Sequence, residues 1–277
     1  MQLEEEPLLL KLVELRRRLD VLDLLDAHFP NSFRFDSSAQ SNVIELYRRA
    51  DTIRSKLEIL NFELYEGVRG EIQNGGGWGA LLQWAGGLGD CNGAGYDYLD
   101  ELISGVLQIE EPASVGDQRD PEMVFYQPTP ARHIFSLIEQ TALTEDDVLV
   151  DLGSGLGHVP LLVSICSGAR CVGIELEAAF VERARECARK LNLDRVSFLQ
   201  QDAREADLSM GTVFFLYTPF TGSILNRVRA NLRHEAGRRR IRICTFGPCT
   251  TVVGEESWLE TLSAQEMDRV VVFHSRG

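Results

Sequence analysis

The sequence has no apolar run long enough to cross a membrane, no C-x-x-C pair of cysteines and few lysines. A membrane helix needs about 20 consecutive apolar residues. The chain starts with Met-Gln-Leu-Glu-Glu-Glu, where a secretory signal would carry basic residues. We therefore expect a protein without membrane spans that resides in the cytoplasm.

Six cysteines are present, but their spacing matches no metal-ligand pattern with histidine. Cys166, Cys171 and Cys187 fall within predicted strands or helices, which is typical of buried free thiols. We expect no metal site.

The net charge of −14 is unevenly distributed along the chain. Residues 1–120 carry 22 acids and 11 bases, and residues 121–277 carry 20 acids and 17 bases. Phosphate backbones are bound through clustered cations, so this distribution disfavours DNA or RNA as substrate and better suits a neutral or cationic one. Seven arginines lie between Arg227 and Arg242, and we interpret them as a solvated helix face and loop.

The first third of the sequence has helical periodicity. Leucines recur at spacings of three and four between Leu8 and Leu22, and apolar residues do so from Val43 to Ile72. These patterns predict two amphipathic helices, and Tyr98–Leu107 predicts a further one. We expect residues 1–121 to form a helical N-terminal region that acts as a lid or recognises the substrate.

Two segments of this region lack helical periodicity. Residues 74–95 contain many glycines together with Trp78 and Trp84, which predicts a compact loop. This loop is either a structural connector or part of a pocket rim. Residues 110–121 are acidic, contain Pro112 and Pro121, and are predicted to be a linker.

From residue 122 to 277, strand and helix patterns alternate. Such alternation predicts an α/β domain with a mostly parallel, Rossmann-like sheet and helices on both faces. The strands are expected at Val148–Leu152, Cys171–Glu175, Val196–Gln200, Thr212–Tyr217, Ile241–Phe246 and Val270–His274. The helices are expected at His158–Ser167, Ala178–Leu191 and Gly222–Leu232, with another following Pro130 as far as Gln140.

The first of these strands runs into a turn with glycines at 153, 155 and 157. A glycine turn between a strand and a helix lets backbone N–H groups approach a ligand closely. A dinucleotide-binding turn would require its third glycine at position 158, which is His158. A nicotinamide-dependent oxidoreductase is also disfavoured because no Tyr-x-x-x-Lys pair is present, Lys190 being the only lysine after position 56.

With Asp151 before it, this G-x-G-x-G turn resembles motif I of the class I S-adenosylmethionine-dependent methyltransferases. The resemblance implies S-adenosylmethionine as cofactor, bound beside Gly153, Ser154, Gly155 and Gly157. It also implies that Asp151 orders the turn.

Two carboxylates follow the next two predicted strands. Glu175 lies 18 residues after Gly157, close to the spacing of an acid that binds ribose hydroxyls. We assign Leu176 to the same site. In the resembled family an Asp in the place of Asp202 accepts a hydrogen bond from the adenine amino group, and Ala203 adjoins it.

The fourth predicted strand ends in Tyr217-Thr218-Pro219-Phe220. In the resembled family this position faces the methyl group, and enzymes that methylate amides carry an N/D/S-P-P-aromatic motif here. The chain lacks the carboxamide or carboxylate of that motif. We expect Tyr217 and Phe220 to shape the pocket for an amine, with Phe220 contacting a cation.

The segment Phe125-Tyr-Gln-Pro-Thr-Pro130 precedes the first helix of the α/β region. It resembles the cofactor-covering segment of several protein-lysine methyltransferases, including the Dot1-like enzymes and relatives that modify an ATP synthase subunit. The resemblance implies that Tyr126 and Thr129 cover the cofactor. Tyr126 is also expected to shape the methyl-transfer pocket.

These patterns predict a methyltransferase that acts on an amine, with a protein lysine as acceptor. Alternatives are a small-molecule methyltransferase with the N-terminal helices as lid, a nicotinamide-binding protein, and a non-catalytic interaction module. His158 follows the glycine turn and is expected to face solvent or a neighbouring loop rather than act as a general base. The sequence leaves the oligomeric state open.

Overall fold

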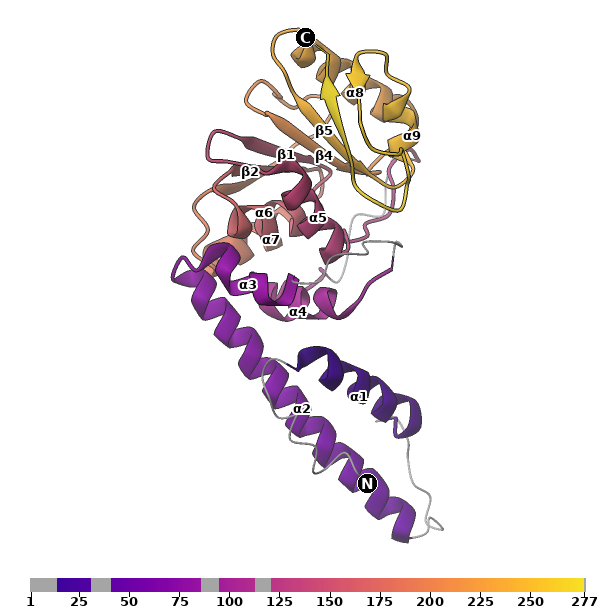
Figure 1. Cartoon of the computed structure of the whole chain (residues 1–277). Coiled ribbons are helices and arrows are strands. Elements are labelled where there is room, and N and C mark those ends of the chain that lie inside the picture. Colours follow the sequence, from indigo (N-terminus) through magenta and orange to yellow (C-terminus); the bar gives the residue numbers. More distant parts are fainter. Residues whose placement is uncertain (1–13, 31–40, 86–94, 113–120, 277) are drawn as a thin grey trace. The chain divides into compact units, whose positions relative to one another are not determined.

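The structure, a computed structural model, describes residues 14–30, 41–85, 95–112 and 121–276 (Figure 1). The chain divides into two compact units, Met1–Gly70 and Glu71–Gly277. The boundary predicted between residues 121 and 122 therefore differs from the division by contacts, and the roles predicted for the two regions stay predictions.

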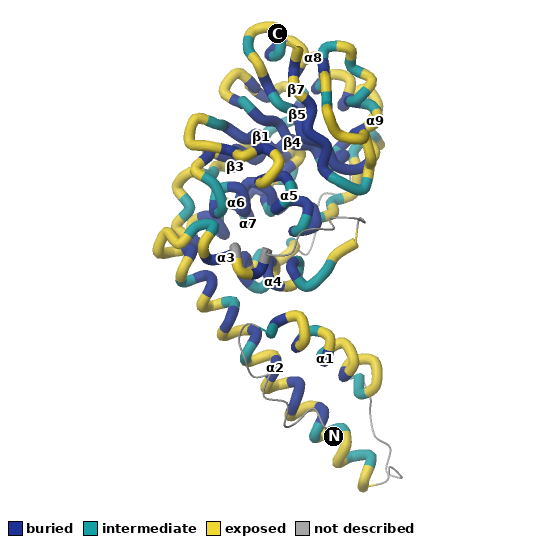
Figure 2. Tube along the Cα trace, in the orientation of Figure 1, coloured by how far each residue is buried: buried dark blue, intermediate teal, exposed yellow. Residues whose placement is uncertain are grey.

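The first unit contains helix α1 (Leu15–His28) and most of helix α2 (Ser41–Gln73). Both were predicted, although residues 1–13 lie outside the described residues. Buried residues recur along α2 at helical spacing, and Figure 2 shows them as dark bands. Val21 and Leu25 of α1 pack with Ala50, Ile53 and Leu57 of α2. Each helix thus buries the apolar face that its sequence predicts.

The second unit begins with α3 (Gly77–Ala85), α4 (Tyr98–Leu107) and α5 (Ala131–Thr141). The prediction of a loop over residues 74–95 was wrong for α3, and residues 86–94 lie outside the described residues. Helix α3 forms because Leu81 and Trp84, three residues apart, bury almost completely, and Trp78 packs against Phe135 of α5. This tertiary burial outweighs the cost of glycine in a helix.

The remainder of the unit is built on a seven-stranded sheet with the order β3-β2-β1-β4-β5-β7-β6. The strands are β1 (Val148–Leu152), β2 (Arg170–Glu175), β3 (Val196–Gln200), β4 (Val213–Tyr217), β5 (Arg242–Phe246), β6 (Leu259–Glu260) and β7 (Val271–Ser275). The first five are parallel, and β7 pairs antiparallel with β5 and β6. All but the two-residue β6 were predicted.

Helices α6 (His158–Cys166), α7 (Ala178–Lys190), α8 (Gly222–Ala236) and α9 (Cys249–Gly254) follow β1, β2, β4 and β5. In Figure 1, α5, α6 and α7 lie together on one side of the sheet, and α8 lies on the other. Alternate residues of β1 and β4 pack against α8 in one core cluster: Val148, Val150, Leu152, Phe214, Leu216, Ile224, Leu225 and Val228. The predicted fold class is therefore confirmed.

The order of the strands fixes where a ligand can bind. Strand β1 lies between β2 and β4, so the connections from β1 and from β3 leave the sheet in opposite directions. A crevice forms outside the carboxyl ends of parallel strands at such a switch point. Glycine turn 153–157 and Glu175 lie at this edge.

The described residues bear on the expectations about membrane spans, metal sites and cysteines. None of their helices is long and apolar enough to cross a membrane. The described residues also contain no cluster of side chains suited to a metal ion. Cys171 and Cys187 are buried free thiols, as predicted, and Cys166 is a partly buried one.

Candidate functional site

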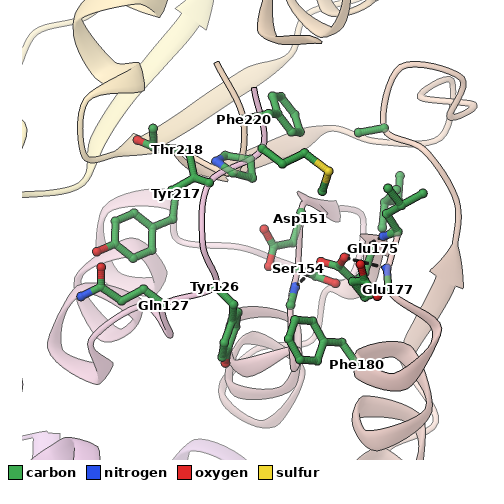
Figure 3. Close-up of a pocket in the computed structure, with 18 of the residues that line it drawn as sticks. Tyr126, Gln127, Asp151, Ser154, Glu175, Glu177, Phe180, Tyr217, Thr218 and Phe220 are labelled. Atoms are coloured by element: carbon green, nitrogen blue, oxygen red, sulfur yellow. Dashed lines mark hydrogen bonds between the residues drawn. The ribbon is translucent and has the colours of Figure 1, made fainter. Parts of the chain in front are cut away.

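A cavity of about 680 Å³ opens at the carboxyl ends of β1, β2 and β4. Its size is that of a pocket for a cofactor or a drug-sized ligand. Every residue predicted for the site lines this cavity except Gly157: Tyr126, Thr129, Asp151, Gly153, Ser154, Gly155, Glu175, Leu176, Asp202, Ala203, Tyr217 and Phe220. In Figure 3, Glu175 lies on one side of Asp151, and Tyr217 and Gln127 lie on the other.

The glycine turn has the backbone conformation that requires glycine. Gly153, Gly155 and Gly157 have φ angles of +83°, +52° and +84°, which L side chains adopt only with strain. The turn is fastened to β2, because the N–H groups of Gly153 and Ser154 donate to the Ile174 carbonyl at 2.8 and 3.0 Å.

Close packing gives these glycines a second constraint. A Cβ would overlap a different neighbouring side chain in each case: Pro219 at Gly153, Tyr126 at Gly155 and Phe198 at Gly157. The sequence predicts glycine here for the approach of a ligand. In the structure the glycines also let the Tyr126 ring and Pro219, both in the cavity wall, lie against the turn.

Glu175, at the end of β2, is held by backbone donors. Its Oε2 accepts the Gly155 N–H at 2.8 Å, and its Oε1 accepts the N–H groups of Leu176 and Glu177 at 2.7 and 2.9 Å (Figure 3). A carboxylate offers about four acceptor positions. Three are taken within the protein, so the buried carboxylate has room for about one further donor.

Asp151 lies in the centre of the sheet and is 4% exposed. Burial, and secondarily the negative charge of Glu175, raises the pKa of its carboxyl well above the ordinary value. A carboxyl group that is costly to ionise in the free protein gains most from a cationic ligand. Asp151 is thus suited to face an ammonium group.

Asp202, which follows β3, is paired with Arg204. The Arg204 side chain donates to both oxygens of Asp202 at 2.7 to 3.1 Å, and the Arg204 N–H donates to Oδ1 at 2.8 Å. The hydrogen bond from Arg204 lowers the pKa of Asp202. A ligand that binds this carboxylate must therefore share it with Arg204. Beside it, Ala203 is buried, whereas Leu176 is exposed on the cavity wall.

The segment before α5 supplies another wall. Thr129 is buried, and the Tyr126 ring lies 4.9 Å from the Phe180 ring of α7. The Tyr126 hydroxyl lies 3.2 Å from Nδ1 of His158. His158 lines the cavity and, as predicted, faces a neighbouring loop, the segment that contains Tyr126.

The turn after β4 combines an open and a buried aromatic residue. Tyr217 is partly exposed and packs on Phe246 with ring centroids 4.6 Å apart. Phe220 reaches the cavity wall but is only 4% exposed and packs in the core. Phe220 is thus mainly a structural residue at this edge, whereas Tyr217 is accessible from the cavity.

Thr218, between these aromatics, has a φ of +38° although it is not glycine. Such a backbone costs on the order of 1–3 kcal/mol and persists where the surroundings fix it. Its hydroxyl donates to the Phe246 carbonyl at 3.1 Å and accepts the Cys249 N–H at 3.0 Å. These bonds hold the turn in the shape that presents Tyr217.

The turn is joined to the segment before Tyr126. The Val124 N–H donates to the Pro219 carbonyl at 3.1 Å, and the Thr221 N–H donates to the Glu122 carbonyl at 2.8 Å. The Glu122 carboxylate also accepts the Ile224 N–H at the start of α8. Two walls of the cavity are therefore linked by backbone hydrogen bonds.

The sequence did not identify several cavity residues, among them Gln127, Glu177, Phe180 and Thr218. The sequence indicated Phe180 as a cavity residue only weakly, because it is an aromatic residue in the first turn of the helix that follows Glu175. The predicted solvated arginine stretch has ion pairs from Arg229, Arg238, Arg239 and Arg242 to nearby acids. None of these arginines lines the cavity.

Comparisons with known proteins agree with this geometry. Residues 143–233 match the sequence family described as a methyltransferase domain. An uncharacterized protein of Methanocaldococcus jannaschii is 37% identical over 62 residues, covering 22% of this chain and 28% of that protein. A histone-lysine N-methyltransferase of Cryptococcus neoformans, specific for H3 lysine-79, is 51% identical over 47 residues, covering 16% of this chain and 7% of that protein.

A solved RNA methyltransferase from Salinibacter ruber, in complex with S-adenosyl-L-homocysteine, is 29% identical with a TM-score of 0.42. The matched region covers 54% of this chain and 92% of the RNA methyltransferase. The chain spans less than a third of the length of the curated relatives named above. The family match, the strand order and the glycine turn show that the chain contains a domain of the class I S-adenosylmethionine-dependent methyltransferase superfamily.

Proposed function

We propose that this chain transfers a methyl group from S-adenosylmethionine to an amine, and that the acceptor is the side chain of a protein lysine. The observation that carries the proposal is the cavity at the ends of β1, β2 and β4, with its acidic and aromatic walls. Four carboxylates line it, Asp151, Glu175, Glu177 and Asp202, against the single arginine Arg204 among its described lining. This excess of acidic over basic side chains favours cationic groups, such as the sulfonium and the ammonium of the cofactor.

The cofactor-binding roles follow from the geometry of each group. Glu175 has room for about one further donor, which suits a ribose hydroxyl. Asp151 faces the ammonium group of the methionine end, and the glycine turn packs beneath it. Asp202 accepts the adenine amino group in place of part of its bonding to Arg204. Leu176 and Ala203 contact the purine, and Thr129 and Tyr126 cover the cofactor.

The bound cofactor supplies a methyl group activated by a sulfonium. The acceptor amine would first lose its proton to solvent, and its nitrogen lone pair would then take the methyl group while the cofactor leaves as a neutral thioether. The main task of the protein is to hold the nitrogen in line, which contributes on the order of 7–11 kcal/mol. Tyr126 and Tyr217 form aromatic walls that exclude water, and desolvation lowers the pKa of an amine. We assign Phe220 to support these walls from the core.

The lysine acceptor is supported by the local similarity to the histone-lysine enzyme and by the acidity of the cavity. A small-molecule amine is the second candidate, because α4 and the segment before α5 are joined. Asp100 of α4 accepts the Ala131 N–H at 2.7 Å, and the Tyr96 hydroxyl donates to the Pro128 carbonyl at 2.8 Å. Such a joined rim suits a lid over a small acceptor as well.

Titration with S-adenosylhomocysteine tests the cofactor site. We expect binding by the wild-type chain, at least tenfold weaker binding by Glu175→Ala, and unchanged binding by Glu182→Ala, whose side chain lies exposed on α7 outside the cavity. Absence of binding by the wild type, or equal binding by both variants, refutes the cofactor assignment.

Incubation of cell lysate with methyl-labelled cofactor tests the acceptor. We expect methyl-lysine after hydrolysis of the protein fraction, with Glu175→Ala as the inactive control. Label that appears only in the small-molecule fraction refutes the protein-lysine acceptor while preserving the methyltransferase assignment.

A further inference from the structure

His158 is a cavity residue to which the proposed reaction gives no role. It is the first residue of α6 and lines the cavity beside the glycine turn. Its Nδ1 lies 3.2 Å from the Tyr126 hydroxyl, a contact between residues 32 positions apart. Tyr126 belongs to the covering segment, so this contact joins that segment to the floor of the cavity.

The Tyr126 hydroxyl and Nδ1 of His158 share one hydrogen bond. A neutral imidazole can donate or accept at Nδ1, and a phenol can do either as well. With either tautomer, the contact needs a hydrogen-bonding atom at the place of Nδ1.

The surroundings keep this imidazole neutral. Burial lowers the pKa of His158 to about 4, and the N-terminus of a helix disfavours a cation. With Nδ1 engaged by Tyr126 and the ring reluctant to take a proton, His158 is unsuited to act as a base for the acceptor amine. Its contribution is to hold Tyr126.

The Tyr126 ring is restrained on three sides. Its hydroxyl is held by His158, one side lies 4.9 Å from the Phe180 ring, and another lies against Gly155, where a Cβ would overlap it. Figure 3 shows Tyr126 and Phe180 side by side in the wall next to Asp151. A ring fixed here presents its aromatic surface to a ligand beside the glycine turn.

We propose that His158 is a positioning residue that holds the Tyr126 ring against the sulfonium of the bound cofactor. This proposal rests on the proposed cofactor site. An aromatic ring attracts a cation through its quadrupole, so a correctly held Tyr126 favours the charged sulfonium of S-adenosylmethionine over the neutral thioether of S-adenosylhomocysteine. The structure thus assigns to His158 an effect on the ratio of the two affinities.

The test compares both ligands in calorimetric titrations of four chains. His158→Phe keeps a ring but removes the nitrogen that bonds to Tyr126. His158→Asn retains an acceptor oxygen close to the place of Nδ1, whereas His158→Gln places its oxygen near the place of Nε2. We expect the affinity ratio of S-adenosylmethionine to S-adenosylhomocysteine to fall about three- to tenfold in the Phe and Gln variants, the range of one hydrogen bond or cation–π contact, and to be restored in the Asn variant.

Tyr126→Phe provides an independent variant, because it keeps the ring and removes only the hydroxyl. It is expected to lower the ratio as much as His158→Phe, and the double variant should lower it no further. Equal losses of both affinities, no change in the ratio, or additive losses in the double variant overturn the positioning role. Failure of the wild-type chain to bind either ligand instead overturns the cofactor site on which this role rests.

Discussion

Gly155→Ala tests the architecture of the site most directly, because two separate costs can be worked out from the structure. Gly155 has a φ of +52°, and an alanine in that conformation costs about 1–2 kcal/mol. The added Cβ would also lie 2.5 Å from Cδ2 of Tyr126, whereas ordinary contacts begin at 3.4 Å. The Tyr126 ring, which also contacts Phe180, must therefore move about 1 Å away from the turn, and such overpacking costs about 1–3 kcal/mol.

We therefore expect Gly155→Ala to lower the free energy of unfolding in urea by about 2–5 kcal/mol. The two costs can be separated in the background of Tyr126→Ala, where the added methyl has room and only the backbone cost of about 1–2 kcal/mol should remain. Gly79→Ala is the matched control, since Gly79 lies in α3 without a positive φ, and a methyl group added there would meet no atom within 4 Å. That variant should be neutral or slightly stabilising, because alanine favours a helix.

The midpoints and slopes of urea unfolding give the free energy of unfolding of each of these chains. An unfolding free energy of Gly155→Ala within about 0.5 kcal/mol of the wild type, the scatter of ordinary surface substitutions, would refute the packing of Tyr126 on the turn. An equal loss in the Tyr126→Ala background would refute the steric part alone and leave the backbone cost.

Two further predictions concern the carboxylates. Because the pKa of Asp151 is raised in the folded protein, the stability of the ligand-free protein should fall as the pH rises from the ordinary aspartate pKa through the raised one. In the same pH window, cofactor binding should release a proton and strengthen with pH. Titrations in buffers of different ionisation enthalpy count the released protons; Asp151→Asn should abolish the release, and an unchanged count in that variant would contradict the assignment of Asp151 to the ammonium group. Arg204→Met should raise the pKa of Asp202 and tighten S-adenosylhomocysteine binding up to about tenfold, because one hydrogen bond of the carboxylate is freed for the adenine amino group. S-inosylhomocysteine lacks that amino group, so its affinity should not change. An equal increase in affinity for both ligands would disprove a hydrogen bond from adenine to Asp202.

The sheet was largely predictable because its strands are short apolar runs between turns. Val148–Leu152 is buried along its whole length, as parallel strands covered on both faces require. Strand β6 has only two residues and leaves no run to detect. Helix α3 was missed because its glycines read as a loop, whereas the burial of Leu81 and Trp84 comes from tertiary packing.

The candidate site was predictable where one motif lies on one turn, and not where distant segments meet. The glycine turn and Glu175 are two positions of a single strand-turn-helix pattern. The hydrogen bond between Tyr126 and His158 and the pairing of Asp202 with Arg204 depend on side-chain directions that no spacing encodes. Phe220 has the residue type of a pocket aromatic, yet its position in the core was set by the packing of α8 against the sheet.

The hydrogen bonds between residues 122–124 and the turn after β4 have a consequence for how the molecule opens. The N–H groups of Val124 and Thr221 each donate to a carbonyl of the other segment. Neither proton can exchange with solvent unless these two segments separate, so both should report the same opening free energy once the intrinsic exchange rate of each amide is divided out. Amide exchange at these two positions thus reports one breathing motion of the cavity wall, and a ligand that bridges the two segments would slow both protons by the same factor.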